Sequence, residues 1–325
     1  MTVSGLASTK RPETNMRSDF AAIAWASGLV GIASLTFWAV RKWQRERKLS
    51  NLGCFPGDPL EAVVEAHVDY LKIHFPKHYK KFSNLLNSDP EAARAEAAVF
   101  AFLKALGRHP EPADDPETGG IDFLCKPNGR EPFGVEVTTL SEDSVSRHSQ
   151  IPKDQFEGGG TFQMVTHALW AKVRDKAEQL SNYPHARILA VVSTHHAANS
   201  LFDATGAEWL LTSEPRITYP MDGLDQSFGE TTDLASSVFF RPNTAREIVP
   251  CRQSVSAVLL VSLDDCQSRV LGILHPRPAY EFDIGNLPEV PFVRVREWPI
   301  IGAKVRTEWT ISNPQAKGFF HILAR

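Results

Sequence analysis

With 325 residues, 42% of them hydrophobic and 22% charged, the chain can bury a large core, which excludes an intrinsically disordered protein. Its net charge of -3 at pH 7 excludes a globally basic protein, so binding to nucleic acid would need a local basic surface. The four cysteines form no CxxC pair, which argues against structural zinc and against a disulfide framework and is typical of a reducing compartment.

After a tail at 1–19, residues 20–40 form a run without a charged side chain, FAAIAWASGLVGIASLTFWAV. The run is long enough to cross a bilayer, and it predicts an N-terminal transmembrane helix. Three basic residues precede the run, and a denser basic group follows it, Arg41, Lys42, Arg45, Arg47 and Lys48. This bias predicts a single-pass membrane protein whose C-terminal domain lies in the cytoplasm. A cleaved signal peptide and a buried soluble helix are the alternatives.

Residues 41–88 predict a basic juxtamembrane and helical linker. An amphipathic pattern between Leu60 and Leu71 predicts a helix, and a basic stretch, HFPKHYKKF, follows it. Lys77, Lys80 and Lys81 of this stretch could contact phosphates or anionic lipid, but a solvated helix face is the simpler interpretation.

Residues 89–107 carry a complete set of helix signals. Asp89 is a predicted N-cap, Pro90 lies in the first turn and Gly107 is a terminator. Glu96 shares a helical stripe with three apolar residues, Val99, Phe100 and Leu103. We therefore expect Glu96 to turn towards the core, with a partly exposed helix-edge glutamate as the alternative.

Residues 119–139 predict two strands joined by a tight turn at 127–129, with one carboxylate in each apolar run, Asp122 and Glu136. Burying either carboxylate is costly unless a cation neutralises it. Pairing of the two strands would bring the carboxylates together, and a hard divalent cation would relieve their repulsion. The hairpin therefore predicts a metal site.

Residues 161–183 predict a further helix with one polar stripe, because Lys172, Lys176, Gln179 and Tyr183 follow at steps of four, three and four. A solvated helix edge with snorkelling lysines is the alternative explanation. The apolar run ARILAVVS after it predicts a buried strand.

The region 206–325 predicts a C-terminal β-rich extension of the sheet or a separate subdomain. Its expected strands lie at 237–240, 257–263, 270–275, 291–295 and 319–323.

The order of helix with Glu96, hairpin with Asp122 and Glu136, helix with two lysines and apolar strand resembles the PD-(D/E)XK nuclease superfamily. The resemblance covers about residues 89–193 of a core that we expect at 89–205. It implies an α/β fold, a restriction-endonuclease-like mixed sheet flanked by helices. It also implies that Asp122 and Glu136 bind Mg²⁺, or alternatively Mn²⁺, with help from Glu96.

The chain departs from the family pattern at two places. The family's lysine follows the third-strand acid by two positions, where this chain has Thr138, so the segment reads ExT in place of ExK. Some members supply this lysine from the following helix, where Lys172 or Lys176 stands. The stretch GRHPEPADDPETGG occupies the place of the family's first core strand, which is therefore either very short or replaced by a loop.

The segment QLSNY is similar to the QxxxY motif of the RecB-like branch, which implies that Gln179 and Tyr183 bind substrate. The resemblance as a whole implies a membrane-anchored, Mg²⁺-dependent nuclease acting on nucleic acid, with DNA as the first expectation. A catalytically inactive relative that binds nucleic acid or acts as a scaffold on the membrane is the alternative. A plain membrane-anchored interaction protein with internally paired acids is a third. The oligomeric state carries no sequence signal.

Overall fold

The structure, a computed structural model, describes residues 59–114, 120–149, 162–195, 202–212, 215–218, 229–232, 237–263, 268–297 and 306–311. All of these belong to one compact unit, Gly57–Arg325. The expected transmembrane run 20–40 and the expected strand 319–323 lie outside the described residues. Within those residues, no helix combines the length and the apolar character needed to cross a membrane.

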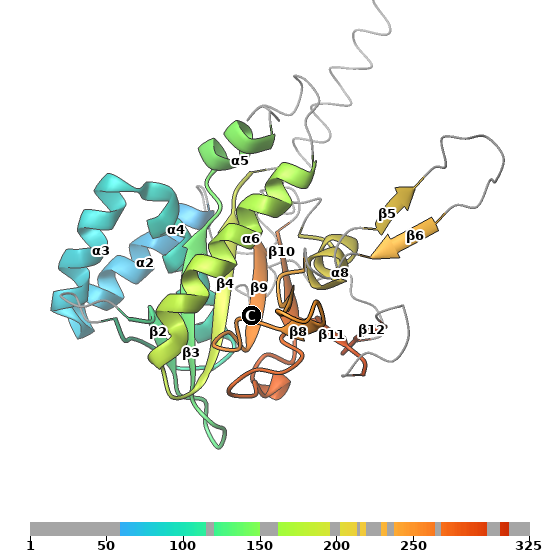
Figure 1. The fold of residues 1–325 in the computed structure, drawn as a ribbon. Helices are drawn as coiled ribbons and strands as arrows, with labels where there is room; N and C mark the ends of the chain where they lie inside the picture. The colour runs from blue at the N-terminus through green and yellow to red at the C-terminus, as the bar shows by residue number, and fades with distance from the viewer. Residues whose placement is uncertain are drawn as a thin grey trace, which may run out of the picture. The chain divides into compact units, whose positions relative to one another are not determined.

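An eight-stranded mixed sheet forms the centre of the described part (Figure 1). Its spatial order is β1-β2-β3-β4-β9-β10-β11-β12. The strands are β1 Pro110–Pro112, β2 Phe123–Cys125, β3 Phe133–Thr139, β4 Ala186–Ser193, β9 Ala257–Ser262, β10 Arg269–Leu274, β11 Phe292–Val295 and β12 Thr307–Trp309. The expected α/β class, with a mixed sheet flanked by helices, is confirmed.

The three central strands, β3, β4 and β9, run parallel. Strands β4 and β9 read ARILAVVS and AVLLVS, and side chains along both are buried, as expected for parallel strands covered on both faces. Because β9 pairs directly with β4, the C-terminal strands continue the same sheet.

The described helices are α2 Pro59–His74, α3 Pro76–Ser88, α4 Pro90–Ala105, α5 Glu142–Ser149, α6 Phe162–Gln179 and α8 Ala204–Thr212, with short 3-10 turns at Leu180–Asn182 and Ile284–Asn286. Two separate hairpins complete the described elements, β5 Pro215–Thr218 with β6 Gly229–Thr232 and β7 Phe240–Pro242 with β8 Ile248–Pro250. Helix α4 packs on one face of the sheet, and α6 and α8 pack on the other. Helices α2 and α3 pack against α4 (Figure 1).

Helix α4 forms as its local signals predict. The Asp89 side chain accepts a hydrogen bond from the Ala92 amide, and Pro90 occupies the first helical position. The helix stops before Gly107, whose φ of 69° is the left-handed conformation that glycine adopts without a steric penalty. These end signals fix the position of Glu96 on the helix.

The hairpin also forms as predicted, with β2 and β3 antiparallel and Phe123 paired with Val135. Of the two alternatives for the first core strand, the structure has the very short one, because β1 spans three residues and pairs with β2. The strand expected at 237–240 is wrong for most of its length, since β7 begins only at Phe240.

Candidate active site around Asp122 and Glu136

The β2–β3 register places Asp122 opposite Glu136, one position beyond the paired residues. Asp122 stands just before β2, where the ladder between the two strands has ended. Its Oδ2 accepts a hydrogen bond of 2.7 Å from the Val137 amide, which would otherwise lack a ladder partner on that side. The Asp122 carboxylate is therefore fixed against the strand that carries Glu136.

Glu136 is buried in β3, with 6% of its side chain exposed. Its Oε1 accepts a hydrogen bond of 2.6 Å from Nζ of Lys176, which α6 supplies from 40 positions along the chain. Its Oε2 is buried and has no hydrogen-bond partner among the described residues. One half of the Glu136 carboxylate is thus neutralised by a lysine, and the other half is left with an open acceptor.

Both carboxyl groups have pKa values above their ordinary range. Burial raises the pKa of Asp122 well above its usual value, and the charges of Glu136 and Glu96 raise it further, against the opposing effects of the Val137 amide and Lys176. Burial likewise raises the pKa of Glu136, whereas its hydrogen bond to Lys176 lowers it. The pair therefore carries a repulsion that a bound cation would relieve.

Glu96 lies on the same side of the sheet as the rest of α4, and its charge reaches Asp122. Its side chain is 23% exposed, and Nε2 of His67 lies 3.9 Å from its Oε1, too far for a hydrogen bond. His67 is buried against the rings of Phe82 and Phe100, and neither of its ring nitrogens has a hydrogen-bond partner among the described residues. Glu96 is turned inward but not enclosed.

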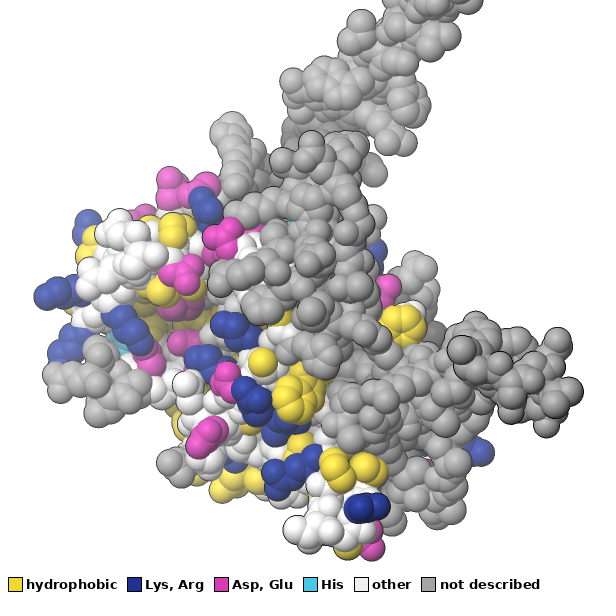
Figure 2. Space-filling view, turned by 45° about the horizontal axis from the view of Figure 1, so that its top comes forward, with side chains coloured by type: hydrophobic (Ala, Val, Ile, Leu, Met, Phe, Trp, Pro, Cys, Tyr) yellow, Lys and Arg dark blue, Asp and Glu magenta, His cyan; other side chains and the backbone are white. Residues whose placement is uncertain are grey.

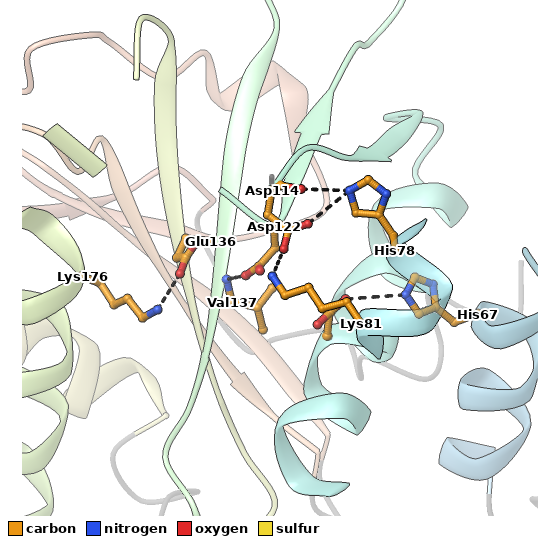
Figure 3. Close-up of polar contacts among 9 residues, drawn as sticks. His67, His78, Lys81, Asp114, Asp122, Glu136, Val137 and Lys176 are labelled. Atoms are coloured by element: carbon orange, nitrogen blue, oxygen red, sulfur yellow. Dashed lines mark hydrogen bonds and ion pairs between the residues drawn. The ribbon is translucent and has the colours of Figure 1, made fainter. Parts of the chain in front are cut away.

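Figure 3 shows how these groups are divided: Glu136 and Lys176 lie on one side of β3, whereas Lys81, Asp114 and His78 lie on the other, with Asp122 between them. Within the described ranges, no three His, Cys, Asp or Glu side chains are already arranged to hold a metal ion. The open Oε2 of Glu136 and the two raised pKa values nevertheless fit a divalent cation with oxygen ligands.

The structure separates the two candidate lysines. Lys176 reaches Glu136, whereas Lys172, one turn earlier and half-buried, makes no hydrogen bond or ion pair with the described residues. Thr138, at the family's lysine position, is buried and brings no positive charge to the site. Lys176 is therefore the lysine that the fold brings to the acids.

Neither residue of the expected substrate-binding pair makes a hydrogen bond to the acids among the described residues. Gln179 is exposed at the last position of α6. The ring of Tyr183 packs against Gly134, where an added Cβ would lie 2.8 Å from the ring. Tyr183 therefore packs beside β3, two residues before Glu136.

A second group near the acids gave no site signal in the sequence, namely Lys81 and His78 of α3 together with Asp114. Asp114 is buried and forms an ion pair with Lys81, and Nε2 of His78 donates to the Asp114 carbonyl oxygen at 2.9 Å. The sequence shows that this stretch of α3 is basic. It does not show that Lys81 contacts Asp114, because the two residues are 33 positions apart.

A scan against protein-family models, a search of curated proteins and a search of solved structures found no match to this chain. The functional assignment therefore rests on the residues and their geometry.

Proposed function

We propose that the protein is a membrane-anchored, Mg²⁺-dependent nuclease of restriction-endonuclease-like fold that hydrolyses phosphodiester bonds of nucleic acid, DNA in the first instance. The single observation that carries this proposal is the contact of Lys176 with Glu136 beside Asp122. Helix α6 thereby supplies the lysine that β3 lacks, since β3 has Thr138 at the family's lysine position.

The order of elements supports the same proposal. Helix α4 is followed by the antiparallel strands β1, β2 and β3, then by the short α5 and by α6, and then by β4, which is parallel to β3. This is the succession of helix, acidic hairpin, lysine helix and strand from which the resemblance to the PD-(D/E)XK superfamily was drawn.

In this proposal Asp122 and Glu136 would hold the metal ion, and Glu96 would assist through a water molecule or a second ion. Bound Mg²⁺, or Mn²⁺ in its place, would orient the scissile phosphate, lower the pKa of the attacking water and stabilise charge on the leaving oxygen. Hydrolysis adds the water across the P–O bond, and it leaves a phosphate monoester and a hydroxyl group.

The protein's own residues position the reacting groups. Lys176 uses one of its three N–H donors on Glu136, and among the described residues no other hydrogen bond engages this ammonium, so its remaining donors could stabilise a phosphate oxygen or the nucleophile. The Val137 amide holds Asp122 in place, so this carboxylate does not need to reorganise when a cation arrives.

The membrane part of the proposal rests on the charge-free run 20–40 and on the basic residues that follow it. Fractionation of cells that express the full-length chain tests it. We expect the protein in the membrane fraction, resistant to carbonate extraction, and its release by carbonate would reject the anchor.

Thr138 favours a second candidate, a catalytically inactive relative that binds nucleic acid or acts as a scaffold. The Lys176–Glu136 pair is also compatible with acids that are paired only internally. However, the buried Oε2 of Glu136 has no hydrogen-bond partner among the described residues, and burial and the charge of Glu136 raise the pKa of Asp122, which together support a cation-dependent role.

The decisive experiment incubates the full-length protein with single- and double-stranded DNA and RNA, in Mg²⁺ or Mn²⁺ and in a chelator. We expect metal-dependent cleavage by the wild type and its loss in Asp122→Asn and in Glu136→Gln. The matched control is Glu131→Gln, an exposed acid of the same hairpin. Undiminished cleavage by either site variant would reject the assignment, and binding without cleavage by the wild type would favour the inactive relative.

A further inference from the structure

Helix α3 brings a second cationic side chain to the acids, from the side opposite to Lys176. Lys81 and His78 lie three positions apart on α3 and therefore share a face of this helix. Both are directed at Asp114, just after β1, as Figure 3 shows. The two cationic positions, Lys176 and Lys81, thus lie on either side of the strand that carries Glu136.

Asp114 holds this arrangement in place. Its side chain is 10% exposed, its carboxylate accepts from Lys81, and its Oδ1 lies 3.5 Å from Nε2 of His78. The Asp114 carbonyl oxygen accepts a further hydrogen bond from the same nitrogen. The Lys81 ammonium is therefore positioned by a buried group, although 48% of its side chain remains exposed.

Lys81 also borders a small pocket between α3 and β1. Besides Lys81, His78 and Asp114, the pocket is lined by Glu96, one of the candidate metal-site acids, and by apolar side chains of α2, α3 and β1. The positive charge of Lys81 reaches Glu136, because it lowers the pKa of that carboxyl group. Lys81 is therefore electrostatically part of the acidic site.

The surrounding surface has the charge that a polyanion needs. Lys77 stands one helical turn before Lys81 and is exposed, as is Lys80. Basic side chains lie along the left side of Figure 2, where Figure 1 places α2 and α3. A chain with a net charge of -3 depends on such a local surface to approach nucleic acid.

We propose that the half-exposed Lys81 binds, at the surface of α3, the backbone phosphate next to the scissile one in the nucleic-acid substrate, with Asp114 as its positioning residue. This inference rests on the proposed nuclease function and assigns part of its substrate site. The basic stretch of α3 has no part in the proposed chemistry. This inference gives it a role in binding the nucleic-acid strand.

The test measures binding of a fluorescent 20-nucleotide DNA to full-length protein by anisotropy, with Ca²⁺ in place of Mg²⁺, between 50 and 200 mM KCl. Losing one phosphate contact in Lys81→Gln should weaken binding roughly tenfold at the lowest salt and reduce the slope of log K against log salt by about one. Lys81→Arg should restore most of the affinity, because it keeps the charge.

The matched control is Lys126→Gln, which also removes one exposed lysine and one ion pair, that with Glu111, away from the pocket. We expect this variant to bind like the wild type. Melting temperatures separate binding from a structural role. Lys81→Gln should melt within about 2 °C of the wild type, because the glutamine amide can still donate to Asp114 and His78 stays beside this carboxylate.

Two results would overturn the inference. One is wild-type affinity and salt slope in Lys81→Gln while the wild-type protein still cleaves nucleic acid, which leaves the proposed function standing. The other is a loss of affinity in Lys81→Gln that is accompanied by a fall in melting temperature as large as that of Asp114→Asn, because lost stability would then explain the weaker binding. Absence of both binding and cleavage in the wild type would instead reject the proposed function, and this inference with it.

Discussion

Glu136 is a buried carboxylate whose charge Lys176 neutralises from α6. A buried ion pair contributes little net stability, but removing one partner leaves an uncompensated charge. Lys176→Met should therefore lower the free energy of unfolding, in urea without metal, by about 2 kcal/mol, less than for a fully buried pair because Lys176 is 26% exposed. The double variant Lys176→Met/Glu136→Gln should recover most of this loss, and equal stabilities of wild type and single variant would contradict the pairing.

The same lysine should dominate activity. Because Lys176 is hydrogen-bonded to Glu136 and Lys172 makes no hydrogen bond or ion pair with the described residues, Lys176→Met should reduce the cleavage rate by about a hundredfold or more, whereas Lys172→Met should change it only a few-fold. Single-turnover cleavage with saturating metal measures both. A larger loss in Lys172→Met would transfer the catalytic role to that residue.

The pH dependence of stability tests the environment of Asp122. Its folded pKa is raised above the unfolded value of about 3.9. The folded state therefore binds the proton more tightly. The stability that Asp122 contributes is fully present below the unfolded pKa and is lost as the pH rises through the folded pKa. Burial is the main cause of this raised pKa; the charges of Glu136 and Glu96 raise it further, and the Val137 amide and Lys176 lower it.

Asp122→Asn removes this titration while keeping an acceptor for the Val137 amide. In chelator, its stability advantage over the wild type should grow from pH 4 upwards and level off above the folded pKa of Asp122. Urea unfolding at half-unit steps of pH measures the difference. A stability difference that is constant with pH, or that shrinks towards neutral pH, would show that the pKa of Asp122 is not raised in the folded state.

At the scale of single elements, sequence signals predicted the structure best where residues adjacent in the sequence determine it. The cap, proline and glycine of α4 lie within a few residues of the turns that they shape, and the hairpin depends on residues 127–129. The strand expected at 237–240 failed for a local reason that propensity does not show. The Ser237 hydroxyl accepts from the Phe239 amide and donates to the Leu211 carbonyl, and so bends the chain before β7 begins.

Strand β3 has a test of its own at Gly134. An added Cβ would lie 2.8 Å from the ring of Tyr183 and 2.8 Å from Cδ1 of Ile121, so Gly134→Ala should cost about 1–3 kcal/mol of stability. The cost should fall in a Tyr183→Leu background, where the ring is gone. Urea unfolding of the double-mutant cycle, which comprises the wild type, the two single variants and the double variant, measures this coupling. Equal costs of Gly134→Ala with Tyr183 and with Leu at position 183 would disprove the contact.

At the scale of the whole molecule, the sequence predicted the fold class but not the neighbours of each strand. Strand β9 pairs with β4 across more than 60 residues, and such pairings depend on the complete sheet rather than on local pattern. For that reason the region after residue 206 could equally be expected as a subdomain or as a sheet extension.

The candidate site shows the same limit. The acids and the two candidate lysines could be named from spacing and resemblance. The choice of Lys176 depends on how α6 is rotated over β3, and the contact of Lys81 with Asp114 depends on how α3 packs, neither of which a single sequence encodes locally.

The central claim is that Asp122 and Glu136 together hold a divalent cation. Binding of Mn²⁺ to the full-length protein, followed by the loss of the free-ion electron paramagnetic resonance signal, tests it most directly. We expect saturable binding by the wild type and by Glu131→Gln, and its loss in Asp122→Asn/Glu136→Gln. Binding that is unchanged in the double variant, or absent from the wild type, would contradict the account.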